Sequence, residues 1–410
     1  MPAQPPRSPN IVYVMMDDMG FGDVEGYGRT RMRTPNMRRI MDQGVRFDRM
    51  YTAPTCSPAR IQVLTGCYAQ RMGIPRVLFP DDTVGIGSEM PTVAARLRDH
   101  GYATMAAGKW HVGCREEHLP TRHGFDRYFG LLYSNDMRDL ALYSDEQRTD
   151  EPVDQAALTR RYTEESLAFI EANRERPFFL YLAHTMPHVP LAAEQEFLGR
   201  SACGLYGDTI ECIDHYLGVI MERLEALGLA DDTAIIVTSD NGPWFEGNTG
   251  GSRGRKFGVY EGGVKVPFIA RWPNGIPAGV RSSEPAHLMD MLPTFLRWAG
   301  GEAPSEIDGR DIGPLFRGAG TSPHEHLFLY DHNEIKAVIH GKWKLQLDAE
   351  RGIYGRKSEF PQLYDLEIDP EESYNLASRH PGLVAELGQA VEAFNERMAP
   401  HYVDPIRPGG

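Results

Sequence analysis

One cysteine in this chain lies in a segment that suits nucleophilic chemistry. Cys56 is followed by Pro58 two residues on and by Arg60 four residues on. A proline at a helix start presets the backbone, and a helix N-terminus favours negative charge on an adjacent side chain, to which Arg60 adds a permanent cation. These features fit a reactive thiol of low pKa, and they equally fit a buried structural cysteine beside a helix cap. The residues alone favour neither interpretation.

Acidic and amide side chains occur together at two places that suit a metal ion. Two such pairs each follow a compact apolar run: Asp17-Asp18 and Asp240-Asn241. Their oxygens are hard ligands that suit Ca²⁺ or Mg²⁺, whereas zinc prefers histidine and cysteine. A lone Asp-Asn-Gly sequence is commonly a turn. Two acidic pairs in equivalent places nevertheless predict a site for a divalent cation.

Four basic side chains complete the set of candidate catalytic residues. In a chain with a net charge of -14, an anionic substrate needs a local basic pocket. A single lysine is usually a solvated surface residue, and a single histidine is usually a hydrogen-bonded structural one. Four lysines and histidines are better candidates than these typical cases because they lie in motifs or directly after apolar runs. They are Lys109, His111, His184 and Lys256.

Buried parallel strands are the elements that must position these residues. Four compact apolar runs have the pattern of such strands: 11–16, 103–107, 178–183 and 234–238. Polar residues follow each of these runs. Helical patterns lie between them, at 34–44, 91–101, 159–173 and 206–228. The alternation predicts an α/β fold with a large, mostly parallel central β-sheet flanked by helices. Because ligands bind beyond the carboxyl ends of strands in open sheets, the polar clusters indicate one shared site.

The pattern changes after about Gly318. Short strand candidates at 327–330, 336–340 and 343–347 precede a helix near 383–397. At 410 residues the chain also exceeds the size at which one core usually stops growing. We therefore predict a catalytic α/β domain over residues 1–320. A C-terminal subdomain with a short antiparallel sheet and a closing helix is predicted over 321–410.

Composition argues against two broad classes of protein. General nucleic-acid binding rewards clustered lysine and arginine, which is the opposite of a net charge of -14. No apolar run approaches the roughly 20 residues that cross a bilayer, and the start has no apolar region of a signal peptide. We expect no transmembrane segment and a cytoplasmic location, although a mature form without its leader would look the same. The five cysteines, an odd number, are expected to be reduced thiols.

Several segments together resemble the type I (formylglycine-dependent) sulfatase family of the alkaline phosphatase superfamily. Residues 54–66 are similar to its C-x-P-x-R signature with the trailing Leu-Thr-Gly, and residues 101–111 are similar to its second signature, which ends in G-K-x-H. Residues 253–263 resemble R-G-x-K followed by E-G-G, and residues 183–190 resemble the H-x-P-H-x-P region with one extra residue. The tail at 363–376 is also similar. The resemblance implies an alkaline-phosphatase-like sandwich.

The resemblance also implies a modified nucleophile and a metal. Cys56 would be converted to formylglycine by a formylglycine-generating enzyme, and Arg60 would hold and polarise the product. One divalent ion would be shared by the modified residue and four side chains, with Ca²⁺ as the first choice and Mg²⁺ as the second. The four side chains are Asp17, Asp18, Asp240 and Asn241.

The mechanism that the resemblance implies is in-line attack on sulfur by a hydroxyl of the formylglycine hydrate. Lys109 and Lys256 would hold the sulfate, and His184, with help from Lys256, would protonate the departing alcohol or phenol. His111 would take a proton from the remaining hydroxyl, so that sulfate leaves by elimination. The motif spacing makes His184 the better candidate for the acid and His188 a substrate-side neighbour.

Two other functions compete with an aryl or carbohydrate sulfatase. The first is a phosphonate monoester or phosphodiester hydrolase of the same superfamily, and the second is a non-catalytic binder of sulfated glycans. The lysine and histidine set favours sulfate over phosphorus. Packing is the commoner role of aromatic side chains. The candidates for stacking on a sugar or an aryl ring are nevertheless Trp244, Phe245, Tyr133 and Tyr143. Phe257, directly after Lys256, departs from the small residue usual in the family and implies a different pocket shape.

Overall fold

A large β-sheet runs through the molecule with helices on both of its faces. The computed structural model describes residues 8–150, 152–348 and 359–402. The strands follow the order β10-β2-β9-β8-β1-β7-β3-β4-β5-β6, and β11 pairs with β2. Four neighbouring central strands are parallel: β8 (Thr233–Ser239), β1 (Asn10–Met16), β7 (Phe178–Ala183) and β3 (Ala103–Lys109). The predicted α/β fold with a mostly parallel central sheet is therefore confirmed.

The flanks of the sheet include antiparallel pairs that the sequence patterns did not reveal. On one side, β9 (Lys265–Arg271) runs antiparallel to both β8 and β2 (Val45–Tyr51). The short strands β10 (Val280–Ser282) and β11 (Ala286–His287) extend that side. On the other side, β4 (Arg127–Leu131) is parallel to β3, and β5 (Leu142–Ser144) and β6 (Gln147–Asp150) add antiparallel pairs.

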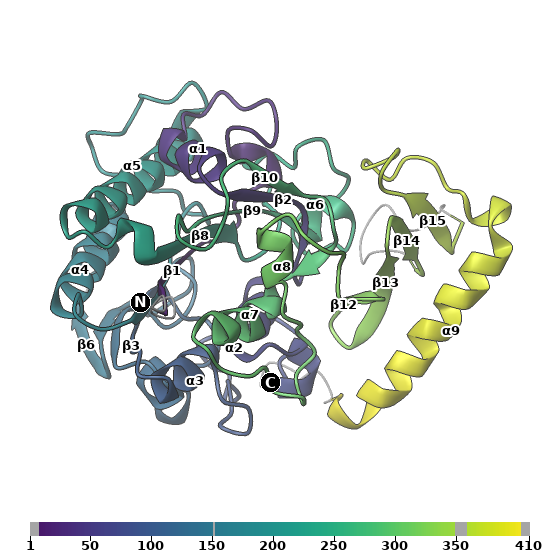
Figure 1. Cartoon of the computed structure of the whole chain (residues 1–410), viewed down its shortest axis with the longest axis horizontal. Helices are drawn as coiled ribbons and strands as arrows, with labels where there is room; N and C mark the ends of the chain where they lie inside the picture. Colours follow the sequence, from purple (N-terminus) through teal and green to yellow (C-terminus); the bar gives the residue numbers. More distant parts are fainter. Residues whose placement is uncertain (1–7, 151, 349–358, 403–410) are drawn as a thin grey trace, which may run out of the picture.

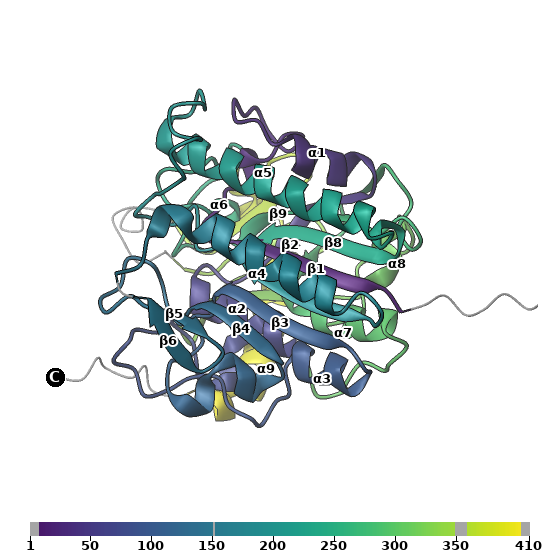
Figure 2. The ribbon, with the colours of Figure 1, turned by 90° about the vertical axis from the view of Figure 1, so that its left-hand side faces the viewer.

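Alternate residues of the strands pack into two separate cores. In β1, Tyr13 and Met15 point into one core, whereas Val12 and Val14 point into the other. The helices on the first face are α2 (Cys56–Thr65), α3 (Val93–Asp99), α7 (Met291–Trp298) and α8 (Gly313–Phe316). The helices on the second are α1 (Pro35–Asp42), α4 (Leu158–Ala172) and α5 (Gly204–Ala226). Figures 1 and 2 show the three-layer arrangement. None of the described helices combines the length and apolar character needed to cross a bilayer.

A second, smaller sheet lies to one side of the first and is covered by the last long helix (Figure 1). It is an antiparallel meander of β12 (Leu327–Asp331), β13 (Glu334–His340), β14 (Trp343–Gln346) and β15 (Gln362–Asp365). The helix α9 (Pro381–Met398) packs Leu387 and Phe394 into a separate core with these strands. The small sheet thus begins at Leu327, and the boundary at residues 320–321 stays a prediction.

A buried network of charges joins the small sheet to the large one. The ammonium of Lys344 on β14 lies 3.1 Å from a carboxylate oxygen of Glu261 and 2.8 Å from one of Glu372. Glu261 begins the short helix α6 (Glu261–Val264), and its backbone N–H donates to Glu372 at 2.7 Å. Lys265 lies 3.3 Å from Glu261. The Lys344 side chain has no exposed surface, and it compensates the charge of Glu372 and, together with Lys265, that of Glu261.

Replacing Lys344 should therefore destabilise the protein strongly. In Lys344→Met, two buried carboxylates lose their shared cation, and the free energy of unfolding should fall by about 3–5 kcal/mol in a urea titration. Lys342→Met is the matched control, because Lys342 lies in the same hairpin and pairs with Asp365, but its own side chain is 39% exposed to solvent. The control should change stability little. Equal losses in the two variants would contradict the importance assigned to the buried network.

Candidate active site

The carboxyl ends of the parallel strands bring most of the predicted residues together. Asp17 and Asp18 follow β1, Lys109 ends β3, and Asp240 and Asn241 follow β8. The sheet order makes β1 a direct neighbour of β8, and only β7 separates β1 from β3. These five side chains are all buried. The expectation of one shared cluster at the strand ends therefore agrees with the structure.

Arg60 holds this cluster together from the first turns of α2. Its guanidinium donates to one oxygen of Asp240 through Nε at 3.1 Å and Nη2 at 2.8 Å, and through Nη1 to the Lys109 carbonyl at 2.7 Å. It also lies 3.7 Å from Asp17. None of these charged side chains has exposed surface. Burial raises the pKa of Asp240 to about 6, as does the nearby Asp17, while Arg60 opposes the rise.

Two lysines pair with the two carboxylates that follow β1. Lys109 Nζ lies 2.5 Å from Asp17 and donates to the Ser134 hydroxyl at 3.1 Å. Lys256 Nζ lies 2.8 Å from Asp18. Burial alone would raise the pKa of Asp17, but the surrounding cations, Lys109 first among them, hold it well below its usual range. Ser134 lies just beyond β4 and belongs to none of the motifs, so the sequence offered no signal for it.

Cys56 is the first residue of α2, and its thiol faces the carboxylates. The sulfur lies 3.5 Å from Asp17 Oδ1. The sulfur and one carboxylate oxygen from each of Asp17 and Asp240 lie within 4.8 Å of one another. Burial, the largest effect, raises the pKa of the Cys56 thiol to about 12 even though Lys109 and Lys256 lower it. The structure thus argues against the low-pKa thiol that the segment allowed on its own.

The two histidines of the segment after β7 are arranged differently from the prediction. His188 Nε2 lies 3.7 Å from Asp18 Oδ2, and ligand atoms of His188, Asp18 and Cys56 lie within 4.8 Å of one another. The His184 ring instead lies beside Tyr162, with the ring centroids 6.3 Å apart. Burial alone lowers the pKa of His184 to about 4, without a contribution from the charged cluster.

The geometry therefore places His188, and not His184, beside Asp18 and Cys56. A sequence signal for His188 existed: His188-Val189-Pro190 keeps the H-x-P spacing, whereas an extra residue stands between His184 and Pro187. His184 directly follows β7, and its backbone N–H donates to the Met15 carbonyl. This hydrogen bond extends the parallel ladder, so the backbone at His184 continues the sheet.

His111 lies two residues beyond Lys109 at the edge of the same cluster. Its backbone is in the left-handed region, with φ of 58°, which non-glycine residues seldom adopt without a local reason. Nε2 lies 2.9 Å from the Leu78 carbonyl, and within the described chain Nδ1 is buried without a hydrogen-bond partner. Burial, followed by the charge of Lys109, lowers the pKa of His111 well below its usual value. The ring is therefore neutral near pH 7.

The donor set fits a hard divalent cation. Three buried carboxylates, Asp17, Asp18 and Asp240, supply oxygen ligands. The side-chain oxygen of Asn241 is buried and, among the described residues, has no hydrogen-bond partner, while its nitrogen donates to Asp18 at 2.6 Å. An unpaired buried oxygen beside three carboxylates is the chemistry that Ca²⁺ or Mg²⁺ satisfies.

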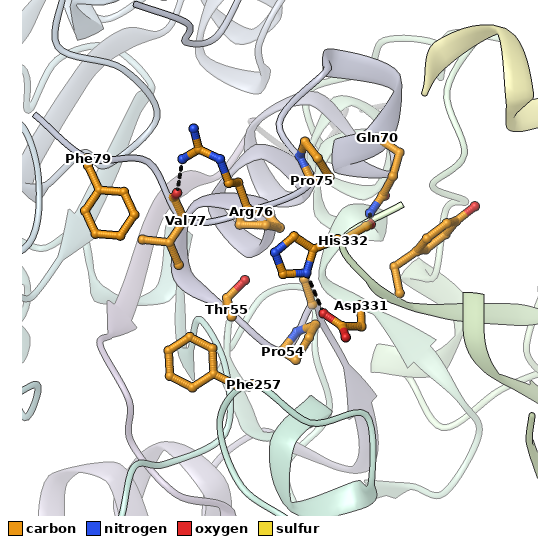
Figure 3. Close-up of a pocket in the computed structure, with 13 residues that line it drawn as sticks. Pro54, Thr55, Gln70, Pro75, Arg76, Val77, Phe79, Phe257, Asp331 and His332 are labelled. Atoms are coloured by element: carbon orange, nitrogen blue, oxygen red, sulfur yellow. Dashed lines mark hydrogen bonds and ion pairs between the residues drawn. The ribbon is translucent and has the colours of Figure 1, made fainter. Parts of the chain in front are cut away.

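A cavity of about 280 Å³ borders the segment that carries Cys56 (Figure 3). Its lining comes from four parts of the chain: Ala53, Pro54, Thr55 and Pro58; Gln70, Pro75, Arg76, Val77 and Phe79; Phe257; and Tyr330, Asp331 and His332. The aromatic side chains in it are therefore not the four proposed for stacking. Tyr133 and Tyr143 pack against the core of the large sheet, and Trp244 contacts Phe245 and Phe257.

Comparison with known proteins gives the same family over nearly the whole chain. The sulfatase family model matches residues 9–301, and the model of the N-sulphoglucosamine sulphohydrolase C-terminal region matches residues 254–396. Human arylsulfatase A is 35% identical, over 94% of this chain and 87% of its own length. Canine N-acetylgalactosamine-6-sulfatase is 36% identical, over 83% of this chain and 72% of its own length.

Solved structures agree with this assignment. The sulfatase PsFucS1 from Pseudoalteromonas is 26% identical with a TM-score of 0.86, and the match covers 98% of this chain and 92% of that one. A protein from a study of glycosaminoglycan metabolism by Bacteroides thetaiotaomicron is 27% identical with a TM-score of 0.87, and the match covers 95% and 100% of the two chains. Metal and formylglycine are general features of such enzymes. The chain therefore belongs to the sulfatase family and is a sulfuric ester hydrolase.

Proposed function

We propose that this sulfatase cleaves an aryl or carbohydrate sulfate ester with a formylglycine made from Cys56 as its nucleophile. The observation that carries the proposal is the position of Cys56, which begins α2 with its sulfur facing buried carboxylates. A buried thiol whose pKa is raised to about 12 is a poor nucleophile at neutral pH. In the hydrated aldehyde, one hydroxyl would attack sulfur and displace the alcohol. Loss of the proton from the other hydroxyl would then expel sulfate together with the attacking oxygen and restore the aldehyde. A formylglycine-generating enzyme is the maturation partner.

Asp17, Asp18, Asp240 and Asn241 are proposed to hold one Ca²⁺, with Mg²⁺ as the second choice. When bound, the cation offsets negative charge on the sulfate and helps to orient the nucleophile. Arg60 keeps the Asp240 carboxylate oriented through two hydrogen bonds to the same oxygen. Its role is therefore to position the ligand set as well as to compensate its charge.

Lys109 and Lys256 bind the sulfate in this proposal. Each ammonium lies against a carboxylate that follows β1, and both point into the cluster around Cys56. Fixed cations stabilise the charge that develops on the sulfuryl oxygens because they need no rearrangement during the reaction. Asp17 and Asp18 in turn hold the two ammonium groups in place.

The two proton transfers are assigned to His188 and His111. His188 is the histidine beside Asp18 and Cys56, so it replaces His184 as the proposed acid for the departing alcohol. His111 is neutral near pH 7, with Nδ1 unpartnered among the described residues, which suits a proton acceptor. Lys256, close to Asp18, is placed to assist the acid.

A phosphonate monoester or phosphodiester hydrolase remains the second candidate function. One solved structure with the same fold is a phosphonate monoester hydrolase from Silicibacter pomeroyi, but at 18% identity it shares the fold alone. The full set of Lys109, His111 and Lys256 favours sulfate. A non-catalytic binder of sulfated glycans is disfavoured because the acid, base and metal candidates are all in one buried cluster.

The modification of Cys56 is the first prediction to test. Protein produced with a formylglycine-generating enzyme should show a loss of about 18 Da in the tryptic peptide containing Cys56 and should release sulfate from 4-nitrophenyl sulfate. Cys56→Ala should abolish the activity, whereas Cys212→Ala, at a buried cysteine of α5, should retain it. Activity from an unmodified thiol, or faster turnover of a matched phosphodiester, would refute the proposed function.

The roles of the two histidines can be separated by the choice of leaving group. His188→Gln should lower kcat for an alkyl sulfate by about 10²–10⁴-fold, because an alkoxide leaves poorly without a proton donor. The loss should be smaller for 4-nitrophenyl sulfate, whose leaving group needs little protonation. His184→Gln is the matched control and should not show this dependence on the leaving group. The reverse pattern would restore His184 as the acid.

The metal assignment predicts a specific response to chelation. Removal of divalent ions with EDTA should reduce sulfate release strongly, because no cation would then offset the charge of the sulfate and orient the nucleophile. Added Ca²⁺ should restore activity better than Mg²⁺, measured as kcat on 4-nitrophenyl sulfate with the metal content read by mass spectrometry. Full activity in metal-free protein would rule out the proposed cation.

A further inference from the structure

We propose that Gln70 and His332 determine substrate specificity by binding hydroxyl groups of a single ring, the alcohol part of the sulfate ester, in the cavity beside Cys56. The inference rests on the proposed function, since it assigns the neighbour of the sulfate pocket. Pro54, Thr55 and Pro58 line the cavity and flank Cys56. Phe257 lines it too and directly follows Lys256. The cavity thus adjoins the backbone on both sides of Cys56, and the proposal places the alcohol part of the ester in it.

Gln70 offers a hydrogen-bond acceptor that no residue of the described chain uses. It lies in the 3-10 helix η2 (Ala69–Met72) and is 2% exposed. Its Nε2 donates to the His332 carbonyl at 2.6 Å, so the orientation of the amide is fixed by a partner that can only accept. Among the described residues, Oε1 is then buried without a partner. A buried acceptor left unpaired is unfavourable, and a ligand hydroxyl would satisfy it.

His332 contributes a second polar group from the small sheet. It lies in the turn between β12 and β13, with φ of 56°, and its Nδ1 is 2.6 Å from the Asp331 carboxylate. That contact fixes the ring and leaves Nε2, on its opposite side, for a ligand. The Gln70 bond to the His332 backbone also ties the turn to the large domain. Two domains therefore share the polar end of the cavity.

Aromatic side chains form the opposite wall. Figure 3 shows Phe79 and Phe257 on one side of the cavity and Gln70, Asp331 and His332 on the other. Both phenylalanine rings are about half exposed, with values of 52% and 54%. The Phe257 backbone is held in the left-handed region at φ of 75° by a hydrogen bond from its N–H to the Pro54 carbonyl at 2.9 Å. The exposed part of this ring is available to stack on a flat or C–H-rich face.

The separation of polar and aromatic walls favours a hydroxylated ring over a simple aryl group. A sugar ring has an apolar face of C–H groups and an edge of hydroxyls, which match the two walls together. A plain aryl ring would match only the aromatic wall and would leave Gln70 Oε1 unpaired. The volume of about 280 Å³ lies just below the usual range of roughly 300–1,000 Å³ for ligand pockets, so it suits one ring better than several.

Pairs of a sugar sulfate and a carbocyclic sulfate, which have rings of the same size but differ in the polar groups on and in the ring, test the inference. The probes are the 2-, 3-, 4- and 6-sulfates of methyl galactoside and methyl glucoside. Each secondary sulfate is compared with cyclohexyl sulfate and each 6-sulfate with cyclohexylmethyl sulfate, using fully modified protein. At least one sugar sulfate should exceed its carbocyclic partner in kcat/KM by about 100-fold or more, since sites built for a hydroxyl reject analogues without it.

Gln70→Met and His332→Phe should each reduce this preference by about tenfold or more, mainly through KM for the sugar sulfate. Gln147→Met, at an exposed glutamine of β6, is the matched control and should keep the wild-type preference. A loss shared equally by sugar and carbocyclic sulfates in the two cavity variants would indicate a structural role and overturn the inference.

Two further outcomes separate this inference from the proposed function. If the wild-type protein releases sulfate from 4-nitrophenyl sulfate but prefers no sugar sulfate over its carbocyclic partner, the inference alone fails. A preference for internal sulfates of an oligosaccharide over every single-ring probe would likewise overturn it. Absence of sulfate release from all probes, 4-nitrophenyl sulfate included, would contradict the proposed function itself.

Discussion

The compensation of charge at the ends of the central strands is the constraint on which this active site depends. Three carboxylates are buried beside one another, and an uncompensated buried charge costs several kcal/mol. Arg60, Lys109 and Lys256 each pair with one of them and thereby fix the relative positions of α2, β3 and the segment before α6. The binding and catalysis that we propose would use the same groups that make this arrangement stable.

The spacing of Cys56 and Arg60 follows from this constraint. The two residues are four apart in α2, so they lie on the same face of the helix, one turn from each other. When Arg60 pairs with Asp240, the first turn is oriented so that the Cys56 sulfur also faces the cluster. The four-residue spacing in the motif therefore matters for the orientation of the Cys56 side chain as well as for the types of residue present.

How much the sequence could predict depended on whether a residue follows a regular element or a loop. Asp17, Lys109 and Asp240 were found because buried parallel strands end at them, and Cys56 and Arg60 because a motif contains them. Motif spacing favours His184 over His188, but both lie in an irregular segment, where distance along the chain does not give distance in space. Ser134 and the cavity were missed for a related reason, since both depend on loop and domain packing that no periodicity records.

The segment from Arg253 to Glu261 contacts both the cluster around Cys56 and the buried charge network of the small sheet. Lys256 reaches the catalytic cluster, and five residues later Glu261 enters the buried charge network with Lys344 and Glu372 of the C-terminal part. Arg253 donates to the Glu372 carbonyl and so ties the same segment down again. Recombination that exchanged the small sheet for an unrelated one would therefore remove the partners of Glu261 and Arg253 and disturb the segment that carries Lys256, a proposed catalytic cation.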